Sequence, residues 1–316
     1  MSDVETGFYS NAAAPVKTMP ATAAKKYCRK RWHAIWALVF SLVLIAIAES
    51  SAQEVVINPN QILDGKPVAA TINWTNQVLR AVGRGETGDS GQVHHAPFHA
   101  MAKARQHAYQ CLLLAAKSVQ LTPTLTVADV LKRNDMRLAE FENLLKSVEI
   151  VKTEFLSTGP VEITLELSLA GKFSAMVLPD TITRLEEIES RQSSAAVDTS
   201  EYTGLVVDAR GLPIVPAMCF QVLDESGKEV YGPAYANREN VVAVGMCQYI
   251  ANIANIENND RVGGNPLMVK GIKVHPPGAS DIIISDTDAA RLRSSVEHLA
   301  FLKNCRVIVV MNTPTQ

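Results

Sequence analysis

Two segments of the chain carry apolar residues at helical spacing. In 97–120 these residues are small or narrow and recur every three or four positions, namely Met101, Ala104, Ala108, Cys111, Ala115 and Val119. A shorter helix is predicted over 134–147, with a core stripe of Met136, Leu138, Phe141, Leu144 and Leu145. The small apolar face of the first helix predicts close packing against another layer.

Strand-like patterns lie on both sides of these helices. Residues 149–156 and 161–169 are separated by a turn sequence, and in the second run apolar and polar residues alternate. Residues 74–82 also have strand character and lead into a glycine-rich turn, whereas 53–73 is predicted to be a lead-in loop. The alternation predicts a small antiparallel sheet with one face under the long helix, so the fold class is α+β for a domain spanning 74–179.

A second module is predicted at 202–316, after a charged, small-residue linker at 180–201. A turn at 224–228 is expected to join two short strands into a hairpin, and a helix begins at an Asp286 N-cap and runs to about residue 302. The strand-like runs are 202–208, 218–223, 229–231, 267–274, 282–285 and 305–311. The strand, helix and strand at the end predict a βαβ-like unit within an α/β-type module.

The N-terminal 1–52 has the pattern of a secretory signal. An uncharged apolar run at 34–48 follows five basic residues and precedes small residues, and it is shorter than a spanning helix prefers. We expect export and cleavage after Ala52, with an uncleaved membrane anchor as the alternative and Met1 or Met19 as the start of translation. Cys28 lies before the run, so a lipoprotein anchor is not predicted. The expected location is the periplasm or outer envelope.

Charge and cysteine content narrow the class of partner. The 316 residues include 30 basic and 32 acidic side chains, which provides no basic excess for nucleic acid. Four cysteines follow the signal, in a compartment that permits disulfides. Cys111 is expected as a buried thiol on the long helix. At most two of the other three, Cys219, Cys247 and Cys305, can pair with each other.

The sequence contains three candidate sites. The glycines at 83, 85 and 88 match G-x-G-x-x-G, but no helix opens at the third glycine, so no dinucleotide and no other cofactor is predicted. His95 and His99 stand one helical turn apart and form a candidate metal site that lacks an acidic ligand. Asp208 with Arg210, at the end of a predicted strand, forms a candidate ligand site or simply a local ion pair.

A set of short motifs in 74–178 resembles a known family. In order, these are Val82-Gly83-Arg84-Gly85, then 102–109 (AKARQHAY), 125–129 (LTVAD) and 161–167 (VEITLEL). Their order resembles the twenty-kilodalton lipoprotein family of bacterial outer envelopes and the N-terminal domain of the flagellar-assembly T protein. The resemblance implies a helix packed on a small antiparallel sheet and a non-catalytic envelope role, in some members beside the flagellar motor. The module at 202–316 resembles extensions of uncharacterised exported relatives.

No nucleophile, base and orienting group can be assigned from the sequence, so no enzyme is predicted. We expect a non-catalytic exported protein with a structural or assembly role at the flagellum or outer membrane. Its partners would be envelope proteins or further copies of itself, with membrane contact only through an uncleaved N-terminal segment. The solvated side of 161–169 is a candidate contact surface if its edge is open. The alternative is a periplasmic ligand- or metal-binding protein.

Overall fold

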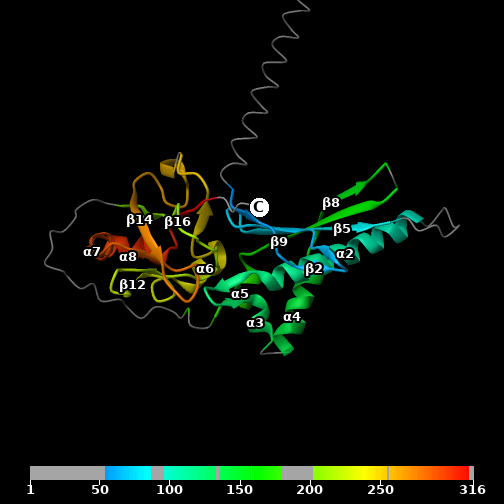
Figure 1. The fold of residues 1–316 in the computed structure, drawn as a ribbon, viewed down its shortest axis with the longest axis horizontal. Helices are drawn as coiled ribbons and strands as arrows, with labels where there is room; N and C mark the ends of the chain where they lie inside the picture. The colour runs from blue at the N-terminus through cyan, green and yellow to red at the C-terminus, as the bar shows by residue number, and fades with distance from the viewer. Residues whose placement is uncertain are drawn as a thin grey trace, which may run out of the picture. The chain divides into compact units, whose positions relative to one another are not determined.

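The computed structural model describes residues 54–86, 96–132, 135–157, 159–179, 182, 202–254 and 256–312 (Figure 1). The predicted signal segment at 1–52, and all of the predicted linker at 180–201 except Ile182, lie outside these residues. Both predicted modules belong to one compact unit, Ala52–Gln316. Within the described residues, no helix is long and apolar enough to span a membrane.

The N-terminal half is built on an antiparallel sheet that confirms the α+β prediction. Its strand order in the described residues is β1-β4-β5-β9-β8. The strands are β1 (Val56–Ile57), β4 (Ala70–Asn73), β5 (Val78–Gly85), β9 (Val161–Ser168) and β8 (Ile150–Phe155). The alternation in β9 places Val161, Ile163 and Leu165 in the core, as predicted.

The long predicted helix is α2 (Ala96–Ser118), which packs across β5 and β9 (Figure 1). Its small side chains Ala104 and Ala108 are fully buried, because they lie against glycines of β5. A Cβ atom on Gly83 would overlap the backbone of both alanines, and one on Gly85 would overlap the backbone of Ala100. The helix and the strand therefore approach more closely than larger residues would allow.

The N-terminal half also contains several shorter helices and strands. The second predicted helix is α4 (Asp135–Lys146), in which Phe141 and Leu145 are buried, but Met136 is 74% exposed and was wrongly placed in the core stripe. Elements not expected from the sequence are β6 (Gln120–Thr122), β7 (Leu125–Thr126), α3 (Val127–Leu131) and α5 (Lys172–Val177). The helix α3 begins with a capping box between Thr126 and Asp129.

Two expectations for the first strands were wrong. The segment 53–73 is not a loop, because it contains β1, β4 and the small hairpin β2 (Ile62–Leu63) with β3 (Lys66–Pro67). The strand predicted from residue 74 begins only at Val78, and it continues through Gly83 and Gly85 instead of turning there. Strands of two to four residues broken by proline and glycine carry too little alternation to be recognised from sequence.

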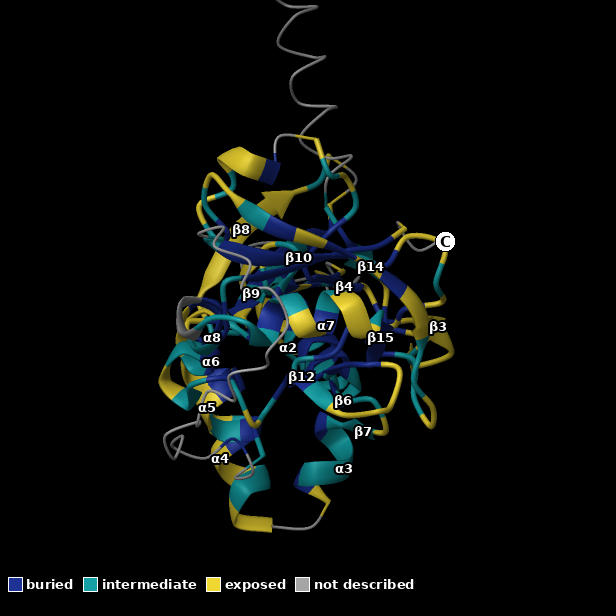
Figure 2. Cartoon of the chain, turned by 90° about the vertical axis from the view of Figure 1, so that its left-hand side faces the viewer, coloured by how far each residue is buried: buried dark blue, intermediate teal, exposed yellow. Residues whose placement is uncertain are grey.

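The C-terminal half contains a mixed sheet whose order in the described residues is β12-β11-β15-β14-β10-β16-β13. Its strands are β10 (Gly204–Asp208), β11 (Val222–Leu223), β12 (Glu229–Tyr231), β13 (Gln248–Ile250), β14 (Pro266–Val274), β15 (Ile282–Ile284) and β16 (Val307–Val310). Strands β14, β10, β16 and β13 are parallel, and β11 and β12 form the predicted antiparallel hairpin. Strand β10 is almost fully buried at the centre (Figure 2).

Helices α6 (Arg238–Val244), α7 (Asp286–Arg293) and α8 (Val296–Lys303) and the 3-10 helix η1 (Ile256–Asn258) accompany this sheet. The predicted helix from Asp286 is divided into α7 and α8, and its N-cap is Ser285, whose Oγ accepts a hydrogen bond from the Asp288 N–H. The predicted βαβ unit is wrong, because β15 is antiparallel to β14 and therefore runs opposite to β16.

Candidate functional site

The predicted metal site is not assembled in the described residues. His95 lies outside them, and His99 is exposed on α2. The nearby His107 accepts a hydrogen bond at Nδ1 from the Arg84 N–H, 3.1 Å away. In the ranges that the structure describes, no three His, Cys, Asp or Glu side chains are grouped so that they could hold a metal ion.

Asp208 and Arg210 are brought together, as one of the two readings of this pair predicted. Arg210 donates from Nε and Nη2 to the two carboxylate oxygens of Asp208, at 2.8 and 2.7 Å. These hydrogen bonds from Arg210 lower the pKa of Asp208. Because each group already satisfies the other at the exposed end of β10, a ligand would have to displace this pair.

The glycine motif serves packing. Gly83 and Gly85 lie inside β5 against α2, and Gly88 lies outside the described residues. The space that a bound phosphate would need above these two glycines is taken by the helix backbone.

Two acids beside β11, the buried Asp281 and the partly buried Glu229, were not among the candidate residues of the sequence. The Gln221 N–H donates to Asp281 Oδ1 at 2.7 Å, and its side-chain Nε2 donates to Glu229 Oε2 at 2.9 Å. Burial raises the pKa of both carboxyl groups. Since their oxygens accept from the protein itself, the pair fixes β11 between β15 and β12. An acid directly before an apolar run, as Asp281 is before 282–284, was the available signal.

The cysteines that the structure describes are free and buried thiols. Burial raises the pKa of Cys219 and of Cys247 to about 12, so both stay protonated at neutral pH. The prediction of a buried thiol at Cys111 is confirmed. None of the three open pairings among Cys219, Cys247 and Cys305 is formed in the described chain.

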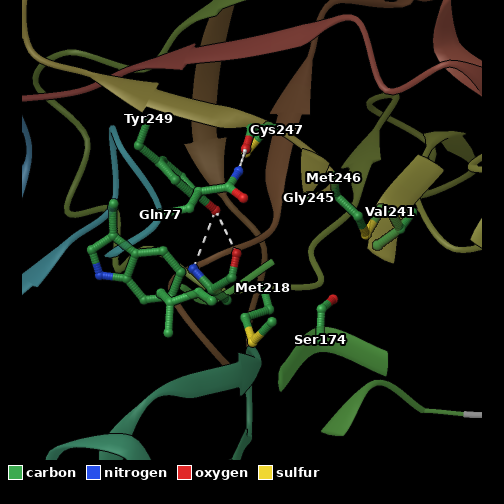
Figure 3. A pocket seen from close by; sticks show the side chains of 11 residues that line it. Gln77, Ser174, Met218, Val241, Gly245, Met246, Cys247 and Tyr249 are labelled. Carbon is green, nitrogen blue, oxygen red and sulfur yellow. Dashed lines mark hydrogen bonds between the residues drawn. The ribbon is translucent and has the colours of Figure 1, made fainter. Parts of the chain in front are cut away.

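The two halves of the unit meet at the turn that follows β4. Gln77 adopts a left-handed backbone (φ 54°) and donates from Nε2 to the Val244 carbonyl oxygen at 2.8 Å. The same Nε2 donates to the Cys247 carbonyl oxygen at 3.1 Å (Figure 3). Thr75 Oγ1 donates to the Tyr249 carbonyl at 2.7 Å. The Trp74 ring meets the Tyr249 ring nearly edge-on, with centroids 5.7 Å apart.

A small apolar cavity remains beside this contact (Figure 3). It leaves about 20 Å³ for the centre of a water-sized sphere, which is room for a single water molecule. Ser174 Oγ is buried at its wall and has no hydrogen-bond partner among the described residues. A water in this cavity would satisfy that hydroxyl, but the volume is too small for a metabolite.

A larger polar cleft of about 480 Å³ lies on the outer side of the same contact. The basic side chain in its lining is that of Arg261, which donates to the carbonyl oxygens of Cys305, Val244 and Gly245. Gln248 donates to the Thr75 carbonyl and accepts from Asn259. Of these hydrogen bonds, the one from Gln248 to Thr75 joins the two halves, whereas those of Arg261 and Asn259 lie within the C-terminal half. The polar groups of the cleft are thus engaged with the protein itself and not aimed at a ligand.

The open edge that the predicted contact surface on 161–169 requires is not present in the described sheet. Strand β9 is paired on both sides, with β5 and β8, so its edge is closed. Within the described residues, β8 is one end of this sheet and pairs on one side with β9, and every residue of β8 is exposed (Figures 1 and 2). Val151 is 54% and Phe155 66% exposed. The β8–β9 hairpin was predicted from the sequence, but which of its strands lies at the end of the sheet was not. The reason is that β9 has the stronger alternation of apolar and polar residues.

In comparisons with known proteins, the C-terminal half of the chain is similar to one domain family. A family model described as Treponema pallidum Tp0624, second domain, matches residues 204–313. The match begins at β10 and extends just beyond β16, so it includes the whole mixed sheet. No curated protein matches the chain.

Proposed function

We propose that this protein is a non-catalytic, exported envelope protein that acts through protein–protein contacts, and that β8 is its binding strand. The observation that carries the proposal is the free edge of β8, six residues long and exposed throughout. An unpaired edge presents N–H and C=O groups that an added strand can bind. The exposed rings and methyl groups of Phe155 and Val151 would supply side-chain contacts to that strand.

The other sheet ends in the described residues are poorer binding edges. β1 is two residues long, and β12 and β13 are three residues each. A bridge from Glu54 to Ile250 covers part of β13. Length matters because each added pair of residues contributes backbone hydrogen bonds, and short edges are a common protection against unwanted pairing. β8 lacks that protection.

The sequence supports the location and the kind of role. The apolar run at 34–48 with its basic flank supports export. The resemblance of 74–178 to outer-envelope lipoproteins and to the flagellar T protein supports an assembly role at the outer membrane or flagellum. The described thiols are buried, and Asp208 and Arg210 are bonded to each other, which favours a role without catalysis.

Photocrosslinking in intact cells tests the binding strand. A photoreactive amino acid replacing Phe155 should give covalent adducts that contain this chain. The matched control replaces Ile62, which is 73% exposed and lies on the short strand β2, outside the main sheet. The control should give few adducts. If position 155 captures no more than position 62, β8 is not the binding strand and the proposal is wrong.

The competing metal-binding hypothesis has its own measurement. Purified protein would have to retain stoichiometric metal that is lost when His95 and His99 are both replaced by Ala. We expect no such loss. That result together with adducts at position 155 favours the association role.

A further inference from the structure

We infer that the strand bound by β8 is β8 of a second copy of this chain, paired antiparallel about a two-fold axis at Thr153. This inference rests on the proposed function, because it names the partner of the same edge. It would join two five-stranded sheets into one continuous sheet. The argument comes from the backbone direction, the charges and the apolar side chains of 151–155.

The backbone places its free groups where such a partner needs them. The Leu156 N–H donates to the Pro160 carbonyl, on the side of β9, at 2.9 Å. Successive residues of an antiparallel strand direct their backbone groups to opposite sides. Thr153 and Phe155 therefore direct theirs to the open edge. A two-fold axis at Thr153 makes this residue and its copy a hydrogen-bonded pair.

The charges are complementary in this register. Pairing about Thr153 sets Lys152 opposite Glu154 of the second copy, and Glu154 opposite Lys152 of the second copy. Both side chains lie on the face away from α2, because they pair with Thr164 and Glu162 of β9. They form a non-hydrogen-bonded pair in the ladder, in which opposite side chains are closest. Within one chain Lys152 Nζ and Glu154 Oε1 are already 2.9 Å apart.

Neighbouring registers are opposed by the same charges. An axis at Lys152 would set two lysines opposite each other, and an axis at Glu154 would set two glutamates opposite each other. Like charges directly opposite one another in a sheet are unfavourable. Of these three two-fold registers, only the one at Thr153 pairs opposite charges.

The apolar residues agree with this register. Phe155 pairs with Val161 and thus lies on the α2 face of the sheet. The two-fold axis sets Phe155 opposite Val151 of the second copy, and both residues are exposed. Val151 lies in the irregularity of the β8–β9 pairing between Ile150 and Lys152, so the regular register covers 152–155 and the charges at 152 and 154 decide it.

A cysteine at the axis tests the pairing in cells. Thr153→Cys, in a full chain that also carries Cys28→Ser, should form a disulfide-linked dimer, because the two Cα atoms of a hydrogen-bonded pair are about 5.5 Å apart. The four described native cysteines are buried and should not contribute. Lys152→Cys is the register control, since residue 152 faces residue 154, and it should crosslink at least tenfold less.

The outcomes separate this inference from the function it rests on. Capture of Thr153→Cys in a disulfide with a different protein would overturn the second-copy inference and keep β8 as a binding strand. Absence of any adduct, here and with the photoreactive residue at 155, would overturn both. Equal homodimer yields from Thr153→Cys and Lys152→Cys would overturn the proposed register.

A charge exchange provides a second readout. Lys152→Glu alone and Glu154→Lys alone should each weaken self-association of the full chain in nonionic detergent by at least tenfold in sedimentation. A mixture of the two variants should associate as a heterodimer, because each charge then meets its opposite. The double exchange should restore the homodimer. If the mixture associates no better than either variant alone, the two-fold pairing is wrong. Circular dichroism melting confirms that all variants are folded.

Discussion

The amide of Gln77 occupies the space that the missing side chain of Gly245 leaves open. A Cβ atom on Gly245 would overlap Gln77 Nε2, and Gly245 has a φ of 73°. The pair joins the turn after β4 to the end of α6, so one glycine at the end of a helix lets the two halves of the unit lock together.

Gly245→Ala should therefore cost more than an ordinary glycine replacement. We expect a loss of about 2–4 kcal/mol in the free energy of unfolding, from left-handed strain together with displacement of Gln77. The control is Gly211→Ala, which has a similar φ of 86° but no atom within 4 Å of the added Cβ. It should lose about 1 kcal/mol. Urea denaturation of both variants measures the difference, and equal losses would mean that Gln77 contributes nothing.

Gly83→Ala should disrupt the contact between β5 and α2. Its Cβ would overlap backbone atoms of the helix, which cannot move aside as a flexible side chain can. We expect a loss of about 3 kcal/mol or more, at the upper end of overpacking effects. Gly264→Ala has open space around the new Cβ and should change stability by less than about 0.5 kcal/mol. A thermal midpoint of Gly83→Ala equal to that of the control would show that the helix does not lie this close.

The decrease in the free energy of unfolding at acid pH should depend on Asp224. Burial raises the pKa of its carboxyl group, but hydrogen bonds from Ser226, Arg293 and the Lys228 N–H outweigh this effect and hold the pKa at about 2. A carboxyl group whose pKa is lowered on folding stabilises the protein above its unfolded pKa. Its contribution, about 2 kcal/mol, is lost as the pH falls from about 4 to about 2.

Asp224→Asn should therefore lower stability at pH 7 and flatten the decline between pH 4 and pH 2 in urea titrations. Asp281 and Glu229 are unchanged in this variant, so the difference between the two curves isolates Asp224. Asp208→Asn is the control, because its ion pair with Arg210 is exposed and should contribute less than about 1 kcal/mol. An Asp224→Asn curve parallel to wild type through the acid range would contradict the role given to Asp224.

The buried thiols should be unreactive in the native protein. With pKa values raised to about 12 by burial, Cys219 and Cys247 present almost no thiolate at pH 7. Iodoacetamide followed by mass spectrometry should label neither residue until urea unfolds the chain. Non-reducing peptide mapping should find no disulfide among Cys219, Cys247 and Cys305. A native disulfide between any two of them would contradict this prediction.

Processing of the N-terminus is testable by mass spectrometry of protein recovered from the envelope fraction. We expect a mature chain that begins near residue 53, because small residues follow the apolar run at 34–48. An N-terminus at Met1 or Met19 on that protein would identify an uncleaved anchor instead.

The sequence by itself determined the elements with strong local periodicity. Helix α2, helix α4 and the β8–β9 hairpin were predicted within a few residues, because their apolar spacing and turn residues are encoded locally. The buried thiol at Cys111 followed from its place on the small face of α2. The α+β class followed from the same patterns.

Only the tertiary structure decided which strands are neighbours, and the contact surface follows from that order. Strand order depends on contacts between residues far apart in the chain, so no local pattern revealed that β8 rather than β9 forms the edge, or that β15 runs opposite to β16. The same holds for Gly83, which resembles part of a phosphate-binding loop until α2 is seen against it. Gln77 and Gly245, 168 positions apart, meet for the same reason: folding brings their segments together, whereas sequence patterns describe each segment alone.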